Sequence, residues 1–292
     1  MQSKIIPNVL FRLKARAVLK PMMPVVILCA LIANLPSLAA QTLSILTNSD
    51  PVTFLYSQAS TDSELVALLS SNEAIFAAFE GFLDPTRMAS LVLSVIAFLL
   101  SPVLTLGLTN ALLKLLRGQE IEVSTVFSRM NIFFKSLLLT LLTIVKILLW
   151  SLPGGLIMVG AGVLSVLTQQ TWPLSLYFVG MTVMMVHMIR AMLHYAMSSI
   201  YLADDPTMGA RAALKSSIAL MKNRKMALLS LTVSVYLWVL IGSLVEGLIS
   251  SMFGAVIAST LFMAFQMIIS VYLSTCHCAF YDAYRQIPYT EA

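Results

Sequence analysis

Residues 88–113 read MASLVLSVIAFLLSPVLTLGLTNALL, an apolar run without a single charged side chain. A helix needs about 20 predominantly apolar residues to cross a bilayer. In hydrocarbon, each backbone amide must be paired within its own helix or within a closed barrel. Apolar and polar residues do not alternate in this run, which favours a helix over a barrel strand. The run therefore predicts a transmembrane helix.

The composition of the whole chain also indicates a membrane protein. Hydrophobic residues make up 59% of the 292 residues and charged residues 11%, whereas soluble domains average roughly 45–50% and about 25%. So few polar residues cannot cover a water-soluble fold. The net charge of +5 does not indicate a nucleic-acid partner, because the basic residues lie in clusters beside apolar runs. Three cysteines, Cys29, Cys276 and Cys278, form no disulfide framework.

Five further apolar runs raise the predicted number of spans to six. The predicted spans are about 21–40, 88–113, 137–159, 174–201, 226–250 and 255–273. We expect an all-α membrane protein made of one polytopic domain, residues 1–292, that folds as a six-transmembrane-helix bundle. Pro153 interrupts the third run, so we expect a kink or a break there. The fourth run is longer than a bilayer requires.

Lysine and arginine are distributed in a way that orients the spans. Most of the 18 basic residues lie in 1–20, 114–135, 211–225 and the C-terminal tail, whereas the segment 47–87 is acidic. The positive-inside rule predicts a multi-pass protein of the cytoplasmic membrane with both termini in the cytoplasm and 47–87 as an outer loop. Ser37-Leu38-Ala39-Ala40 also resembles a signal-peptide cleavage site, but the long basic region before it favours a retained span.

A basic amphipathic segment precedes every second span. These segments are about 5–19, 123–133 and 207–221, with apolar residues spaced by three and four. Two interpretations stay open: interfacial helices that merely lie in the headgroup layer, or three repeats of one interfacial helix plus a transmembrane hairpin. Within the outer loop, residues 63–83 predict an amphipathic helix that either covers the protein's own spans or docks a partner.

The sequence contains none of the common catalytic motifs, so we expect a protein that is not an enzyme and has no catalytic residues, cofactor or metal. Ionisable residues inside spans are the candidate contacts to a lipid or substrate, because burying them is costly. They are Lys146, His187, Arg190, His194 and Glu246. Spacing by three and four places His187, Arg190 and His194 on one side of the fourth span, with Ser198 and Tyr201. A zinc site of Cys276, His277, Cys278 and His194 is disfavoured by the single-residue spacing of the cysteines.

Two stretches resemble a known family. They are Tyr195-Ala-Met-Ser-Ser-Ile-Tyr-Leu-Ala-Asp-Asp-Pro206 with Ala213-Leu-Lys-Ser-Ser-Ile-Ala-Leu-Met-Lys222, and Ala279-Phe280-Tyr281 near the end. Both are similar to the bacterial membrane family known as Domain of Unknown Function 975. Asn223 departs from the glycine usual at its position. The resemblance implies a multi-span protein of the cytoplasmic membrane and supplies no activity.

These observations predict a non-enzymatic scaffold or accessory component that contacts membrane lipids or another membrane protein. The alternative is a small transporter or lipid-translocating protein, motivated by Lys146, the interrupted third span and the polar side of the fourth. A membrane-embedded enzyme is the third interpretation. A polar cavity at mid-membrane lined by Lys146 and Arg190 would favour the transporter.

Overall fold

The computed structural model describes residues 7–46, 85–168 and 172–285. All regular elements in these ranges are helices: α1 (Asn8–Leu46), α5 (Pro85–Leu116), η1 (Val123–Ile132), α6 (Phe133–Thr168), α7 (Pro173–Tyr195), α8 (Ser198–Asp204), α9 (Ala210–Leu220), α10 (Lys225–Phe253) and α11 (Ala255–Arg285). Six helices in the described ranges are long and apolar enough to cross a membrane. The predicted all-α fold with six spans is thereby confirmed.

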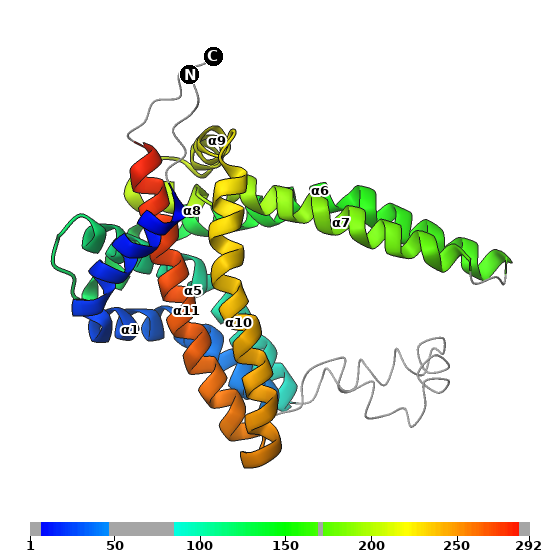
Figure 1. Cartoon of the computed structure of the whole chain (residues 1–292), viewed down its shortest axis with the longest axis horizontal. Helices are drawn as coiled ribbons and strands as arrows, with labels where there is room; N and C mark the ends of the chain where they lie inside the picture. Colours follow the sequence, from blue (N-terminus) through cyan, green and yellow to red (C-terminus); the bar gives the residue numbers. More distant parts are fainter. Residues whose placement is uncertain (1–6, 47–84, 169–171, 286–292) are drawn as a thin grey trace.

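The long helices pair as three consecutive hairpins, α1–α5, α6–α7 and α10–α11. The hairpins diverge: α6–α7 points away to one side, whereas α10–α11 points downward (Figure 1). Each hairpin is preceded by one of the predicted basic segments, in three different forms. The first is continuous with α1, the second is the 3-10 helix η1, and only the third, α9, is a separate α-helix.

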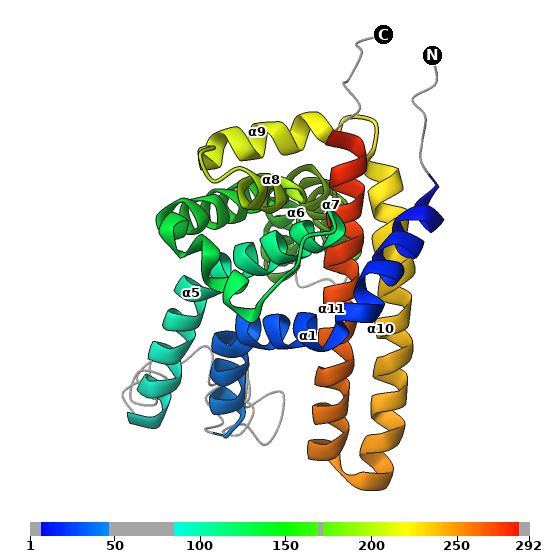
Figure 2. The same cartoon turned by 90° about the vertical axis from the view of Figure 1, so that its left-hand side faces the viewer.

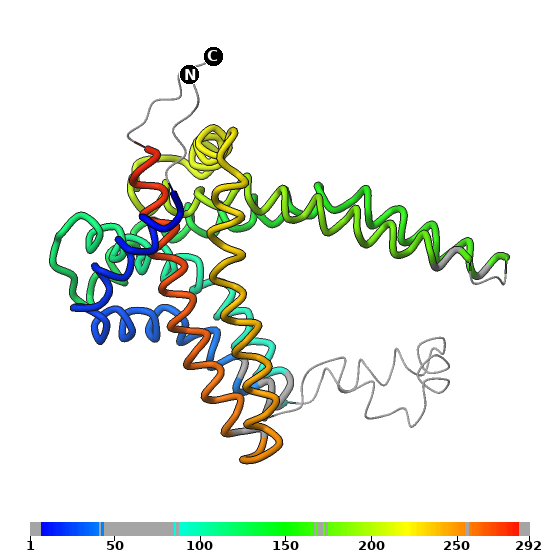
Figure 3. The backbone as a smooth tube through the Cα atoms, viewed as in Figure 1, coloured from blue at the N-terminus to red at the C-terminus, as the bar shows by residue number. Residues whose placement is uncertain are grey.

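Prolines account for the path of the first hairpin. Pro21, Pro24 and Pro36 lie inside α1, and the helix changes direction twice along its length (Figure 3). Pro102 lies inside α5, which also bends (Figure 2). A proline removes one backbone hydrogen bond and pushes against the preceding turn, so it bends a helix.

Helix ends differ from the predicted span ends at three places. α6 continues through Pro153 to Thr168 without a break, because a span tolerates one missing hydrogen bond when neighbouring helices pack against it. The fourth candidate span covers Ser175–Asp204, and a turn at Ala196 and Met197 divides it into α7 and α8, where the sequence predicted one continuous helix to about Tyr201. α11 continues past residue 273 to Arg285, where its side chains are buried by other elements.

Most of the buried core lies at the end of the molecule where α1 begins and α11 ends. Buried side chains of the α1–α5 and α10–α11 hairpins meet there with Met197, which follows α7; among them are Phe11, Leu112, Leu228, Phe280 and Tyr281. In Figure 2, α9 and α8 lie at this same end, and the α10–α11 turn lies at the other. The far halves of the hairpins expose large apolar side chains, such as Phe178 and Leu244. Such surfaces are stable in lipid, which is itself apolar.

Most of the predicted outer loop, with its helix at 63–83, lies outside the described residues. The prediction for that segment stays a prediction.

Candidate functional site

Two of the five predicted site residues contact one indole ring. The ring centroid of Trp150 on α6 lies 6.2 Å from that of His187 and 5.9 Å from that of His194, both on α7. The Lys225 ammonium group at the start of α10 donates to Nε2 of His194 over 2.7 Å. His194 therefore connects the α6–α7 hairpin to α10.

The remaining predicted residues have different surroundings. The Lys146 ammonium group lies 5.9 Å from the ring centroid of Tyr195, a distance at which a cation and an aromatic face attract. The Arg190 side chain is exposed, and its backbone carbonyl accepts from Nδ1 of His194. Glu246 lies on α10, roughly 30 Å along the helix from Lys225 at ~1.5 Å per residue. The structure thus gathers four residues along α6 and α7 and leaves Glu246 apart.

The polar side predicted for the fourth span is not continuous from His187 to Tyr201. The turn at Ala196 and Met197 separates α7 from α8. Ser198 on α8 is buried, and the Tyr201 ring meets Tyr281 edge-on with centroids 4.8 Å apart. These two side chains therefore belong to the core, whereas Arg190 lies on the surface.

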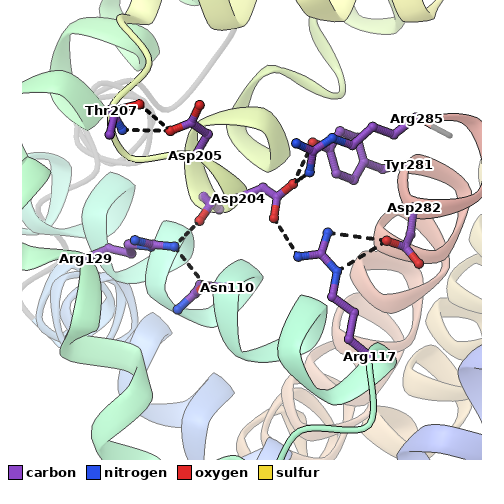
Figure 4. A network of polar contacts seen from close by, with 10 residues as sticks. Asn110, Arg117, Arg129, Asp204, Asp205, Thr207, Tyr281, Asp282 and Arg285 are labelled. Atoms are coloured by element: carbon purple, nitrogen blue, oxygen red, sulfur yellow. Dashed lines mark hydrogen bonds and ion pairs between the residues drawn. The ribbon is translucent and has the colours of Figure 1, made fainter. Parts of the chain in front are cut away.

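The main charged cluster centres on Asp204, at the end of α8 (Figure 4). One carboxylate oxygen accepts from Arg117, the residue that directly follows α5, over 2.7 Å. The other accepts from the Tyr281 hydroxyl over 3.0 Å and pairs with Arg285, both on α11. Arg117 also donates to Asp282, and Lys14 of α1 lies 3.6 Å from that carboxylate. We call these contacts the Asp204 network, which joins α1, α5, α8 and α11.

A second set of contacts holds the segment that follows Asp204. Arg129 of η1 donates to Asn110 of α5 and to the backbone carbonyl of Ala203, and Lys135 donates to the Pro206 carbonyl over 2.9 Å. Figure 4 shows Arg129 and Asn110 beside the network.

Asp205 begins a local turn at the same place. Its carboxylate accepts from the Thr207 hydroxyl over 2.6 Å and from the Thr207 amide over 3.0 Å. These hydrogen bonds hold the pKa of Asp205 below its usual value. The Asp205 carboxylate is therefore charged at neutral pH and accepts both hydrogen bonds of the turn that leads the chain into α9.

The sequence did not predict the Asp204 network, because the candidate site residues were chosen among ionisable residues inside spans. One signal pointed to it: Asp204 and Tyr281 lie in the two stretches that carry the family resemblance. The structure brings these stretches into contact through the Tyr281 hydroxyl.

Two pockets adjoin α1 and α11. The first, which we call the basic pocket, has a volume of about 580 Å³ and lies between α1, α10 and α11. Its lining consists of Arg12, Arg16, Leu19, Lys20, Met23, Ser234, Val235, Trp238, Ile268, Ile269 and Tyr272. The second, the polar pocket, has about 380 Å³ and includes Asn34, Ser37, Thr260, Gln266 and Ser270. Neither pocket is lined by Lys146 or Arg190.

The cysteines and their neighbouring histidine are packed inside the protein. Cys29, Cys276 and Cys278 are free and buried. The His277 ring nitrogen Nε2 lies 3.0 Å from the Thr232 hydroxyl. Within the described ranges, no three His, Cys, Asp or Glu side chains lie close enough to share a metal ion.

Six apolar helices that are long enough to cross a membrane define an all-α, multi-pass membrane protein. The chain belongs to the family described as Protein of unknown function (DUF975), which matches residues 14–287. The resemblance found in the sequence is thereby confirmed. No curated protein and no solved structure matches the chain.

Proposed function

We propose that this protein is a non-enzymatic scaffold or accessory component of the cytoplasmic membrane, with both termini in the cytoplasm. In this role it contacts lipid and a second membrane protein through its hairpins. The end that carries the Asp204 network supplies a common base, and the three hairpins project from it into the bilayer.

The observation that carries the proposal is the mutual neutralisation of charge in the Asp204 network. Asp204 is paired with two arginines, and Asp282 with Arg117 and Lys14. Catalytic acids and bases need a free position that faces a substrate, whereas these carboxylates are occupied by the protein's own cations. Such an arrangement fixes how helices meet, which is what a scaffold requires.

The test is purification of the full-length protein in native lipid, without detergent, followed by identification of what accompanies it. We expect one membrane protein in a constant ratio to the chain, together with bound lipid. Repeating the purification with Asp204→Asn should reduce the amount of partner, because the hairpins lose their common base. A homogeneous preparation with lipid and no protein partner would contradict the accessory role.

A lipid-translocating role is the second candidate, and the polar pocket favours it. Five side chains that can form hydrogen bonds line this pocket between α1 and α11. The basic pocket adjoins the next part of α11 toward Arg285. In hydrocarbon, such groups mark paths for polar substrates.

Reconstitution into vesicles with fluorescent lipids tests this second candidate. Faster exchange of lipid between leaflets, slowed when Asn34 and Gln266 are replaced by leucine, would support translocation. An exchange rate equal to that of empty vesicles would exclude it and leave the accessory role.

A further inference from the structure

Three basic side chains of α1 line the basic pocket from one side of the helix. Arg12, Arg16 and Lys20 are spaced by four residues, so they follow one another on the same helix face. In residues 7–46, 85–168 and 172–285, no acidic side chain forms an ion pair with any of the three. Lys14, by contrast, pairs with Asp282. Like charges at this spacing repel one another, so the pocket favours an anion.

Arg12 carries a second, independent sign of a missing partner. Its Nε atom is buried, and in the part of the chain that the structure describes it has no hydrogen-bond partner. A buried donor without an acceptor is unfavourable, and nearly all such groups in native proteins are paired. A guanidinium group fits phosphate oxygens well, because its planar N–H groups can donate in parallel. A phosphate group in the pocket would supply the acceptor.

The hairpin α10–α11 sets the depth of the pocket in the bilayer. Its two helices meet at Gly254, and the hydrocarbon layer requires about 20 residues of each. Counting from Gly254 reaches about residue 234 on α10 and about residue 275 on α11. Ser234 and Tyr272, which line the pocket, lie at this level. The pocket therefore lies where lipid headgroups begin.

The lining changes from polar to apolar toward the hydrocarbon. One helical turn closer to Gly254, roughly 6 Å deeper at ~1.5 Å per residue, Trp238 and Ile268 replace Ser234 and Tyr272. These two apolar side chains are 59% and 40% exposed, so the pocket opens toward acyl chains at this depth. Tryptophan and tyrosine are also the residues enriched at the membrane–water boundary.

We propose that the basic pocket binds the phosphate headgroup of an anionic membrane lipid through Arg12, Arg16 and Lys20, with its acyl chains against Trp238 and Ile268. The inference rests on the proposed function only for the placement of α10–α11 in the membrane. A lipid headgroup and free phosphate share the anionic phosphate group, and the apolar lining assigns the ligand to a lipid and not to free phosphate.

The test uses delipidated full-length protein and counts bound lipids by native mass spectrometry. Short-chain phosphatidylglycerol, short-chain phosphatidylcholine and inorganic phosphate are titrated separately. We expect one phosphatidylglycerol to bind more tightly than phosphatidylcholine. We expect Arg12→Gln with Arg16→Gln to weaken its binding by at least about tenfold, the effect of losing one charge-assisted hydrogen bond.

Two controls separate the site from a general loss of charge or fold. Arg211→Gln with Lys215→Gln removes the same charge from α9, outside the pocket, and should leave binding within about twofold, since neither residue lines the pocket. Arg12→Lys with Arg16→Lys keeps the charge and should restore part of the affinity. Unchanged melting temperatures exclude unfolding as the cause of weaker binding.

Three results would overturn the proposal. They are equal binding of both lipids, unchanged binding by the glutamine double variant, and binding of inorganic phosphate as tight as that of the lipid. The scaffold proposal has its own measurement, which is whether a protein partner copurifies; we expect the partner to accompany the glutamine double variant as well. Unsubstituted protein that binds the lipid but copurifies with no protein partner would refute only the scaffold proposal.

Discussion

Asp204 accepts hydrogen bonds or ion pairs from three side chains: Arg117, which directly follows α5, and Tyr281 and Arg285 of α11. Its own side chain is 8% exposed, whereas Arg117 and Arg285 are 36% and 48% exposed. Neutralising this carboxylate would leave a nearly buried polar side chain between two arginines that water can partly solvate. A substitution of Asp204 should therefore cost more free energy of unfolding than a substitution of either arginine.

We predict that Asp204→Asn lowers the free energy of unfolding by about 2 kcal/mol, the scale of charge-assisted hydrogen bonds. Thermal unfolding of the purified protein, followed by intrinsic fluorescence, measures the change. Asp205→Asn is the matched control, because the Asp205 carboxylate accepts its hydrogen bonds from Thr207 of its own turn and not from another helix. Its effect should stay within about 0.5 kcal/mol. Equal effects of the two substitutions would contradict a special role for Asp204.

Two glycines at the Pro153 site show how closely α6 and α7 approach. A Cβ atom on Gly154 would lie 2.3 Å from the Met184 backbone nitrogen, whereas one on Gly155 would meet nothing within 4 Å. Small residues at such positions let helix backbones come together in membranes. Close approach of α6 to α7 therefore depends on Gly154 and not on its neighbour Gly155.

Gly154→Ala should therefore destabilise the α6–α7 hairpin by about 1–3 kcal/mol, the usual range for overpacking. Gly155→Ala gains the same helix propensity, up to about 1 kcal/mol, without a clash, so it should be neutral or stabilising. Unfolding of the two variants in the same detergent gives the comparison. A Gly154→Ala variant as stable as Gly155→Ala would show that the helices separate freely at this contact.

The side of the membrane on which each end lies is a property of the whole molecule. Lys215 on α9 and Ser251 at the far end of α10 are both exposed, and the three native cysteines are buried. We predict that an impermeant maleimide on intact cells labels Ser251→Cys and not Lys215→Cys, because the positive-inside rule predicts that the basic α9 end faces the cytoplasm. Lysis should make Lys215→Cys reactive. The reverse pattern would contradict the predicted orientation.

The divergence of the hairpins leads to a second prediction at this scale. The α6–α7 hairpin exposes apolar side chains along its length, such as Leu156, Val159 and Phe178, and it points away from α10–α11 (Figure 1). Because exposing this surface to water is unfavourable, we expect both hairpins to enter the same bilayer. Spin labels at Ser175 and Ser251 in lipid discs should then be closer to each other than these two residues are in the structure. A measured separation equal to that in the structure would contradict a reorientation.

Hydropathy and charge alone determined the protein class, the six spans and the three basic segments, because span formation depends on the local composition of about 20 residues. The resemblance in residues 195–222 and 279–281 also sufficed for the family. The predicted site was partly informative: His187 and His194 lie together against Trp150, but Glu246 lies far from them.

Only the tertiary structure decided which charges meet. Arg117 and Asp282 are 165 residues apart in sequence, and Asp204 and Arg285 are 81 apart, so no local pattern relates them. The basic pocket likewise needs three helices, since Arg12 and Arg16 alone read as an ordinary basic flank of a span. The physical reason is that hydropathy acts through composition near one position, whereas ion pairs and pockets depend on how bent helices from distant parts of the chain pack.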